Sequence, residues 1–457
     1  MSFSISRSNM SRRRFLETSA LTVGSAVGAS ALLDGCNTSN STSTSGGGSK
    51  TTVTVMYASN EFLPAYIKEF ENLNPDLKIS FIEFDQTRLD AMMAANTPPD
   101  FVRGTGVGSA NYSARGLALN LDPYLAKSTV LKTSDLMAAN NTWRFNGKQT
   151  GSGSYYGLAK DWSQDATLWV NDALFENAHV APLSDTTPTS YDTLLEIAKK
   201  ITVRQGGKIQ AYGIDPSWVY CAGVVDQMIL QQGGQYFNSD LTEIDYATAA
   251  GKRAIQWFVD FAKAHVGFSP FDPDADGAGN DTPSYLASRL GMVVDGYWFG
   301  GNINTASAAV QAKSRFLPAP IMGSNRVSAC FSATGAWIPA SSKNKDAAWK
   351  VMEYFIGGTP AHDRATSGWG LPSLKSLFNQ IPQKLAYQKQ AYTTAQNELK
   401  YLSVQPDSPY ITGTTMDTLF DKYMQQAVKG QITVSSAAEK ITTDANQHIQ
   451  QTKQQLA

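Results

Sequence analysis

The sequence predicts an α/β fold, in which the strands of a parallel sheet alternate with helices. Residues 51–57 (TTVTVMY) and 77–84 (LKISFIEF) are rich in β-branched and aromatic residues, which predicts two strands. Between them, residues 63–73 carry apolar side chains at helical spacing. A short helix over 87–95 and an apolar strand at 101–102 follow. The order strand, helix, strand, helix, strand is typical of a parallel sheet with helical crossovers.

The first helix has its own start and stop signals. Ser59 or Asn60 can cap its N-terminus, and Asn74-Pro75 is expected to end it. Four apolar side chains are expected on its buried face, namely Leu63, Ile67, Phe70 and Leu73.

Polar side chains follow each of the three strands. Asn60 and Glu61 come after the first strand, Asp85 after the second, and Arg103 at the third. Ligands of parallel sheets bind beyond the carboxyl ends of the strands, so these side chains are candidates for ligand binding. Helix capping and a solvated surface position are the alternative interpretations.

The second half of the chain alternates again. Two amphipathic helices are expected to pack Trp257 and Trp349 into the core, and the chain from Leu385 onward is expected to be polar and helical. Those two helices cover residues 254–265 and 345–356, and the other elements are a helix over 190–201, strands over 289–296 and 315–321, and an extended crossing over 330–340.

The first 35 residues have the pattern of an export signal. An arginine cluster precedes an apolar run from Leu21 to Leu33, which at about 13 residues is too short to span a bilayer and indicates a signal peptide. The start resembles the twin-arginine signal of bacteria, carried here by Ser11, Arg12, Arg13, Arg14, Phe15 and Leu16.

Cys36 closes this signal in the sequence LDGC, which resembles the lipobox of bacterial lipoproteins. We expect Cys36 to be the lipidated first residue, although Asp34 departs from the small or apolar residue usual in that motif. Ordinary cleavage with a free or buried cysteine is the alternative. Residues 36–50, rich in Ser, Thr and Gly, are expected to form a flexible tether, which would place the body of the protein outside the cytoplasmic membrane.

The composition of the chain excludes some function classes. The full chain has a formal net charge of −1, which provides no basic field for nucleic acid, and its 42% hydrophobic residues suffice for a globular core. No second apolar run is long enough to span a membrane. Cys221 and Cys330 are expected to be buried free thiols, although a disulfide between them is permitted outside the cell.

Catalytic and metal motifs are weak. The four histidines are scattered, GTGVGS does not complete a dinucleotide fingerprint, and we expect no cofactor, no metal and no catalytic residue. The loop Asp272–Asp281 copies the start of a calcium loop, but Pro283 stands where a bidentate Glu is required. A turn-rich surface loop is the preferred interpretation, and a weak calcium site is the alternative.

Six segments stand in a characteristic order, namely EFENLNPDLKISF, NTPPDFV, LWVNDALFENAHV, LASRLGMVVDGYW, FSATGAWIPASSKNKDAAWKVMEYFIGG and GLPSLKS. Their order and spacing over about residues 50–440 resemble extracellular solute-binding proteins of family 1, the sugar-binding subunits of ABC importers. The resemblance implies a two-lobe periplasmic-binding-protein-like fold of type II. Both lobes would be discontinuous, the first over 51–160 and 335–375 and the second over 166–330 and 376–457. Hinge crossings would lie near 160–166, 331–334 and Leu374.

The resemblance also implies a ligand and partners. The ligand would be a carbohydrate, whose C–H face stacks on aromatic rings and whose hydroxyls bond to charged or amide groups. The protein would be a monomer held to the membrane by a lipid anchor and would deliver the sugar to the membrane subunits of an ABC importer. Besides the polar residues above, the candidate ligand contacts are Trp162, Trp218, Asp295, Trp298 and Trp369.

Two other functions stay open at this stage. The chain could bind another small polar solute, or it could be a secreted carbohydrate-active enzyme.

Overall fold

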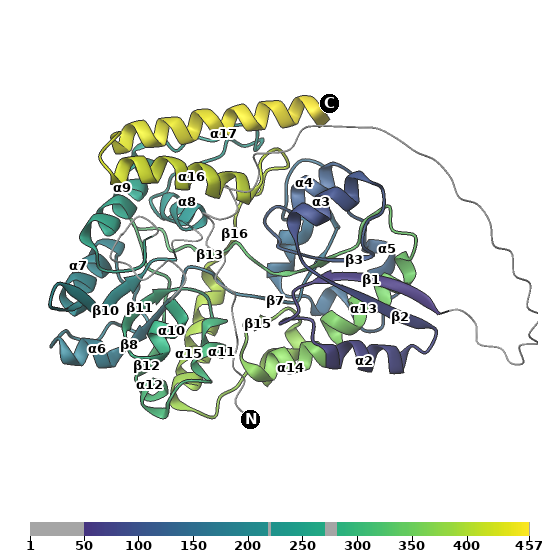
Figure 1. The fold of residues 1–457 in the computed structure, drawn as a ribbon, viewed down its shortest axis with the longest axis horizontal. Helices are drawn as coiled ribbons and strands as arrows, with labels where there is room; N and C mark the ends of the chain where they lie inside the picture. The colour runs from purple at the N-terminus through teal and green to yellow at the C-terminus, as the bar shows by residue number, and fades with distance from the viewer. Residues whose placement is uncertain (1–49, 218–220, 270–280, 457) are drawn as a thin grey trace, which may run out of the picture. The chain divides into compact units, whose positions relative to one another are not determined.

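The computed structural model describes residues 50–217, 221–269 and 281–456. Cys36, Trp218 and all of the candidate calcium loop except Asp281 lie outside these residues. The described chain is built around two five-stranded sheets, each covered by helices (Figure 1).

The first sheet has the strand order β2-β1-β3-β14-β6. Strand β1 pairs in parallel with β2 and β3, as the sequence predicts, whereas β14 is antiparallel to both β3 and β6. The chain therefore returns to this sheet from the second half of the sequence. The strands are β1 (Thr51–Tyr57), β2 (Leu77–Glu83), β3 (Phe101–Gly104), β6 (Leu158–Ala159) and β14 (Gly335–Trp337).

Apolar faces of the surrounding helices pack on this sheet, with Phe62, Phe101 and Phe355 in one buried cluster. Phe62 and Phe355 stack with their ring centroids 4.7 Å apart. The helical elements of this half are α2 (Pro64–Leu73), α3 (Gln86–Ala94), α4 (Ser109–Ala114), α5 (Asp122–Leu125), η1 (Thr133–Asp135), η2 (Ala138–Trp143), α13 (Lys345–Gly357) and α14 (Thr359–Ser367). A short hairpin of β4 (Arg144–Phe145) and β5 (Ser154–Tyr155) joins them.

Helix α2 differs from the expectation in two respects. It begins at Pro64 with Leu63 as its N-cap, so the expected cap at Ser59 or Asn60 is wrong; proline suits the first turn because its φ is already helical. Phe70 is buried as expected, but Leu63 and Leu73 are 38% and 64% exposed, because Tyr66 takes the second core position.

The second sheet has the order β12-β8-β11-β10-β9, in which only β10 and β11 are parallel. Its strands are β8 (Leu168–Asn171), β9 (Val203–Gln205), β10 (Lys208–Asp215), β11 (Leu290–Val294) and β12 (Ser314–Leu317). The helical elements of this half are α6 (Asp172–Asn177), α7 (Tyr191–Ile201), α8 (Cys221–Gln231), α9 (Ala249–Ala264), α10 (Asp281–Leu286), α11 (Phe299–Ile303), α12 (Ala308–Lys313), α15 (Ala386–Glu398), η5 (Leu399–Tyr401), α16 (Gly413–Val428) and α17 (Val434–Leu456). The short helix η4 (Lys375–Gln380) packs on α14 of the first half.

The core of this half holds the residues expected there. Trp257 on α9 is 3% exposed, and Trp349 on α13 of the first half is 7% exposed, so both predictions of core packing are confirmed. Cys221 and Cys330 are buried and free, which confirms the favoured interpretation of the two thiols.

Two short strand pairs lie where the chain passes between the halves. Strand β7 (Asp161–Trp162) pairs with β15 (Leu371–Pro372), and β13 (Ser328–Cys330) pairs with β16 (Leu402–Val404). The chain leaves the first sheet after β6, returns to it at β14 and leaves again after β15. The two discontinuous lobes and the hinge of crossing segments are thus confirmed. We call the half around β1–β3 the first lobe and the half around β8–β12 the second lobe.

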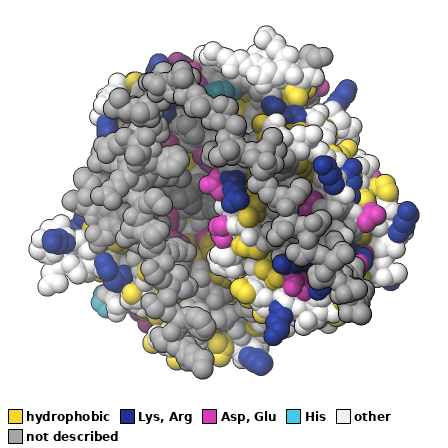
Figure 2. All heavy atoms as spheres, turned by 45° about the vertical axis from the view of Figure 1, so that its right-hand side comes forward, with side chains coloured by type: hydrophobic (Ala, Val, Ile, Leu, Met, Phe, Trp, Pro, Cys, Tyr) yellow, Lys and Arg dark blue, Asp and Glu magenta, His cyan; other side chains and the backbone are white. Residues whose placement is uncertain are grey.

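Two further features bear on function. No helix in the described residues combines the length and apolarity needed to cross a bilayer. On the face drawn in Figure 2, Lys and Arg side chains are scattered among acidic and hydrophobic ones.

Candidate functional site

The carboxyl ends of β1 and β3 bring Glu61 and Arg103 together. Arg103 donates from Nε to Glu61 Oε2 at 2.9 Å and from Nη2 to Oε1 at 3.0 Å, which is a bidentate pair. Burial by itself would raise the pKa of Glu61, but the charge of Lys160 and the bonds from Arg103 outweigh it and lower the pKa. The carboxylate is therefore held ionised at the edge of the sheet, where a ligand of the parallel strands would bind.

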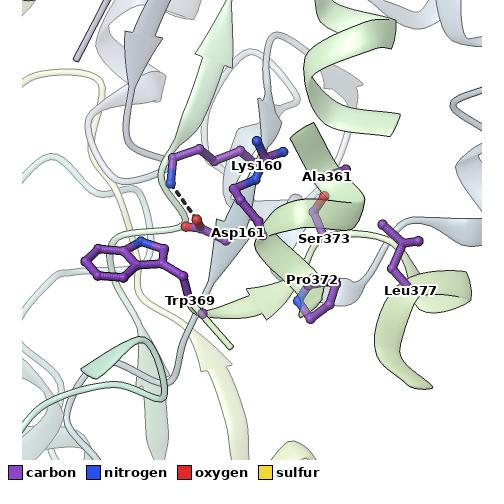
Figure 3. A pocket seen from close by; sticks show the side chains of 10 residues that line it. Lys160, Asp161, Ala361, Trp369, Pro372, Ser373 and Leu377 are labelled. Carbon is purple, nitrogen blue, oxygen red and sulfur yellow. Dashed lines mark hydrogen bonds and ion pairs between the residues drawn. The ribbon is translucent and has the colours of Figure 1, made fainter. Parts of the chain in front are cut away.

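Two charged residues of the first crossing extend this pair. Lys160 Nζ lies 2.5 Å from Asp161 Oδ2 and 3.9 Å from Glu61 Oε1, and only 2% of its side chain is exposed. Lys160, Asp161 and Trp369 line one pocket, and Figure 3 shows the bonded pair beside the indole ring. The result is a network of two carboxylates and two cations, Glu61, Arg103, Lys160 and Asp161, which we call the charged cluster.

A third cationic side chain, Arg364, also lines this pocket. The guanidinium of Arg364 on α14 is 4.5 Å from the ring centroid of Phe355, and its Nη2 donates to the Phe355 carbonyl at 2.6 Å. Its Nε and Nη1 are buried without a hydrogen-bond partner in the described structure, and burial lowers its pKa.

Two tryptophans form the aromatic part of the site. The ring centroids of Trp298 and Trp369 are 5.6 Å apart at an interplanar angle of 46°. Trp298 follows β11 and its backbone N–H donates to Ser163 Oγ at 3.3 Å, so it is fixed to the first crossing. Trp369 lies between Gly368 and Gly370, whose φ angles of 72° and 76° allow the tight loop before β15. Both rings are partly exposed.

Asp295 lies at the edge of this group, but its carboxylate bonds to the backbone of the next residue. It is 6% exposed, and its Oδ1 accepts the N–H of Gly296 at 2.7 Å. Burial raises its pKa well above the ordinary value. Gly296 is required beside it, since a Cβ there would lie 2.4 Å from the Cβ of Ser163.

The structure thus brings Glu61 and Arg103 together, and Trp298 with Trp369, but it places the other candidates elsewhere. Asp85 is exposed and caps α3 through a 2.6 Å bond from the N–H of Arg88. Asn60 is exposed in the turn after β1. Trp162 is 1% exposed and donates its indole N–H to the Pro372 carbonyl at 2.9 Å, inside the β7–β15 pair. Trp218 lies outside the described residues.

Sequence reasoning missed Lys160 and Asp161. It placed a crossing there but singled out only the neighbouring tryptophan. A usable signal existed, because two adjacent opposite charges stand at the start of the crossing, and charges that become buried there need a partner.

The arrangement suits recognition of a polar, hydroxyl-bearing ligand. Partly exposed indole faces can stack on C–H groups, and the charged cluster offers both donors and acceptors. Within the described residues, no group of three or more His, Cys, Asp or Glu side chains could hold a metal ion.

Comparison with known proteins identifies the family to which this chain belongs. Residues 58–357 match the family of bacterial extracellular solute-binding proteins, and the chain belongs to that family. No curated protein matches the chain significantly.

Solved structures of low sequence identity share the fold. The ABC substrate-binding protein of Listeria monocytogenes in complex with cycloalternan is 20% identical, with a TM-score of 0.73 over 87% of this chain and 98% of that one. An ABC transporter solute-binding protein of Thermotoga lettingae bound with α-D-tagatose is also 20% identical, with a TM-score of 0.73 over 88% and 100% of the two chains. The sugar-binding protein MalE of Xanthomonas citri is 16% identical, with a TM-score of 0.66 over 88% and 98%. The two-lobe fold of type II is therefore established.

Proposed function

We propose that this protein captures a carbohydrate between its two lobes and delivers it to an ABC-type importer in the membrane. The single observation that carries the proposal is the contact between Trp298 and Trp369 beside the charged cluster of Glu61, Arg103, Lys160 and Asp161. Stacking rings next to paired charges provide the apolar and polar halves of a sugar site. The ligands of the structural neighbours, cycloalternan and α-D-tagatose, support this class of solute.

The lobes supply the motion that transport requires. We assign the first lobe to residues 51–160 and 335–375 and the second to 166–330 and 376–457. Trp298 comes from the second lobe and Glu61 from the first, so a ligand that contacts both favours the closed arrangement. The importer then recognises the surface of the closed, ligand-bound form.

A thermal-shift screen over a panel of mono- and oligosaccharides tests the function. A ligand present at 100 times its Kd adds about 2.7 kcal/mol to the unfolding free energy, so a cognate sugar should raise the Tm clearly. The bound sugar should be recovered unchanged after long incubation. Recovery of shortened products would instead indicate a secreted carbohydrate-active enzyme, and a shift only with other solutes would exclude carbohydrate.

We also propose a lipid anchor at Cys36, after export by the twin-arginine-like signal, with the mature protein working as a monomer. The tether of residues 36–50 supports this, since it can span the distance from a membrane surface to a folded body. Cys36→Ala should release the protein from the membrane fraction of expressing bacteria. Equal membrane retention of the variant would contradict the anchor.

A further inference from the structure

A cavity of about 330 Å³ lies apart from the candidate site. Four described segments form its wall: residues 149–151 in the β4–β5 hairpin, Leu230 near the end of α8, residues 235–239 with Leu241 after α8, and residues 404–406 at the end of β16. None of its lining residues belongs to the charged cluster or to the Trp298–Trp369 pair. Its volume falls within the range of small-molecule sites, which occur preferentially between domains.

The described lining is polar but uncharged. Among the described residues that line the cavity there is no Asp, Glu, Lys, Arg or His, while Gln149, Gln235 and Gln405 carry amide groups. Phe237, Leu230 and Pro406 add apolar surface. Amide groups that donate and accept, next to an aromatic ring, fit a neutral ligand with hydroxyl groups and C–H faces. An ionic ligand would find no counter-charge among the described lining residues.

Hydrogen bonds hold the walls in place without a ligand. Asn238 Oδ1 accepts the N–H groups of Thr242 and Glu243 at 2.9 and 3.2 Å, which fixes the loop after α8. Gln405 Nε2 donates to the Gly223 carbonyl at 2.8 Å and ties the end of β16 to α8. The N–H of Gly151 reaches the Asn141 and Arg144 carbonyls at 3.1 Å. The fold itself therefore holds the described wall segments of the cavity in place.

We propose that this cavity is a second binding site, for a single neutral sugar unit, and that its occupancy changes the affinity of the site at Trp298 and Trp369. The coupling rests on the proposed function. The hairpin wall at Gln149 belongs to the first lobe, whereas the wall at Phe237 belongs to the second, so any relative motion of the lobes alters the cavity. A ligand that prefers one arrangement shifts the equilibrium toward it, and the two sites then change each other's affinity by the same factor.

The test separates the second site from the first. D-glucose and N-acetyl-D-glucosamine are titrated by ligand-observed NMR into the full mature chain carrying Trp298→Ala and Trp369→Ala. We expect binding to persist there. Adding Ser239→Trp, which fills the cavity from its exposed rim, should weaken it at least about tenfold. Ser341→Trp, an exposed serine of the first lobe outside the cavity, is the matched control and should change nothing.

The outcomes are distinct from those that test the proposed function. Absence of monosaccharide binding to the double variant, or equal effects of Ser239→Trp and Ser341→Trp, overturns the second site. Either result leaves the proposed function standing if an oligosaccharide still stabilises the wild type. In the wild type, saturating monosaccharide should change the Kd of that oligosaccharide, and Ser239→Trp should abolish the change. An unchanged Kd overturns the coupling.

Discussion

The carboxylate of Asp165 accepts two hydrogen bonds from Ser332, one from its backbone N–H at 2.9 Å and one from its hydroxyl at 2.7 Å. A third bond comes from the N–H of Phe331 at 2.7 Å. Asp165 lies in the first crossing and Ser332 in the second, so one buried side chain fastens two of the three hinge segments to each other. The hinge is held by side-chain bonds as well as by strand pairing.

Asp165→Ala should lower the unfolding free energy by about 2–4 kcal/mol, because it leaves two buried N–H groups without an acceptor. Asp165→Asn should cost about 1 kcal/mol or less, since its carbonyl can accept both N–H groups and its NH₂ can donate to the Ser332 hydroxyl. Urea unfolding of both variants measures the difference. Equal losses in the two variants would show that the charge of Asp165, and not its hydrogen bonding, holds the hinge.

The two tryptophans of the site should act as a unit. Trp298→Ala and Trp369→Ala are each expected to weaken carbohydrate binding at least about tenfold, from lost stacking and lost area. Because the rings touch, the double variant should lose less than the sum, with a coupling of about 0.5–1.5 kcal/mol. Titration calorimetry on the wild type, the two single variants and the double variant measures the four binding free energies of this double-mutant cycle.

The control for that cycle is Trp257→Phe, which alters a core ring of the second lobe. It should lower the Tm and leave the affinity unchanged. If Trp298→Ala behaves like Trp257→Phe, then Trp298 is a packing residue and the site assignment is wrong.

Local patterns in the sequence predicted the long elements but not the short ones. β1 and α7 have clear periodicity over seven and eleven residues, and both are present. β7 and β15 have two residues each and pair across more than 200 positions, so no local pattern marks them. The residues of β16 were expected to belong to the helical C-terminal region of the chain. They form a strand because they pair with β13, which is distant in the sequence.

The grouping of the candidate site residues was predictable where it depends on strand ends. Glu61 and Arg103 follow from a parallel pairing of β1 and β3 that the sequence predicted. Lys160 and Asp161 line a pocket with Trp369, which stands far away in the sequence, so no local pattern marks that contact. Trp162, equally conspicuous in the sequence, is buried inside the β7–β15 pair.

Buried carboxyl groups should make stability fall as the pH rises above about 4. Burial raises the pKa of Asp226 to about 8, with a further contribution from nearby Asp417, and raises that of Asp407 to about 7. Between the unfolded value near 3.9 and these folded values, the folded state holds protons that the unfolded state has lost. The unfolding free energy therefore falls by at most about 1.4 kcal/mol per pH unit per group, and this contribution is lost once the pH exceeds the folded pKa.

Asp226→Asn keeps an acceptor for the Tyr246 hydroxyl, which now donates to Asp226 Oδ1 at 2.8 Å, and removes the titration. Its unfolding free energy should depend less on pH between 5 and 8 than that of the wild type, as measured by urea unfolding across this range. Asp240→Asn, at an exposed position nearby in the chain, is the matched control and should follow the wild type. Parallel curves for Asp226→Asn and the wild type would contradict a raised pKa.

The packing of Trp369 on α11 gives a way to move this ring without removing it. Gly301 of α11 faces the indole, and a Cβ at that position would lie 2.9 Å from Trp369 Cε3. Its neighbour Gly300 faces Trp169 instead, with a Cβ 3.0 Å from Cζ2 and Cη2 of that fully buried ring. Alanine is favoured over glycine in a helix by up to about 1 kcal/mol, so both substitutions suit the backbone.

Gly301→Ala should displace the Trp369 ring and weaken binding of a carbohydrate found in the panel about tenfold, with a change in unfolding free energy within about 1 kcal/mol. Gly300→Ala should do the reverse, because overpacking against a core ring costs about 1–3 kcal/mol while Trp369 stays in place. Titration calorimetry and urea unfolding on both variants measure the two effects. If Gly301→Ala binds as tightly as the wild type while Trp369→Ala does not, the ring tolerates displacement and its position in the site is not fixed by α11. If neither variant at Trp369 or Gly301 changes the affinity, Trp369 lies outside the ligand site.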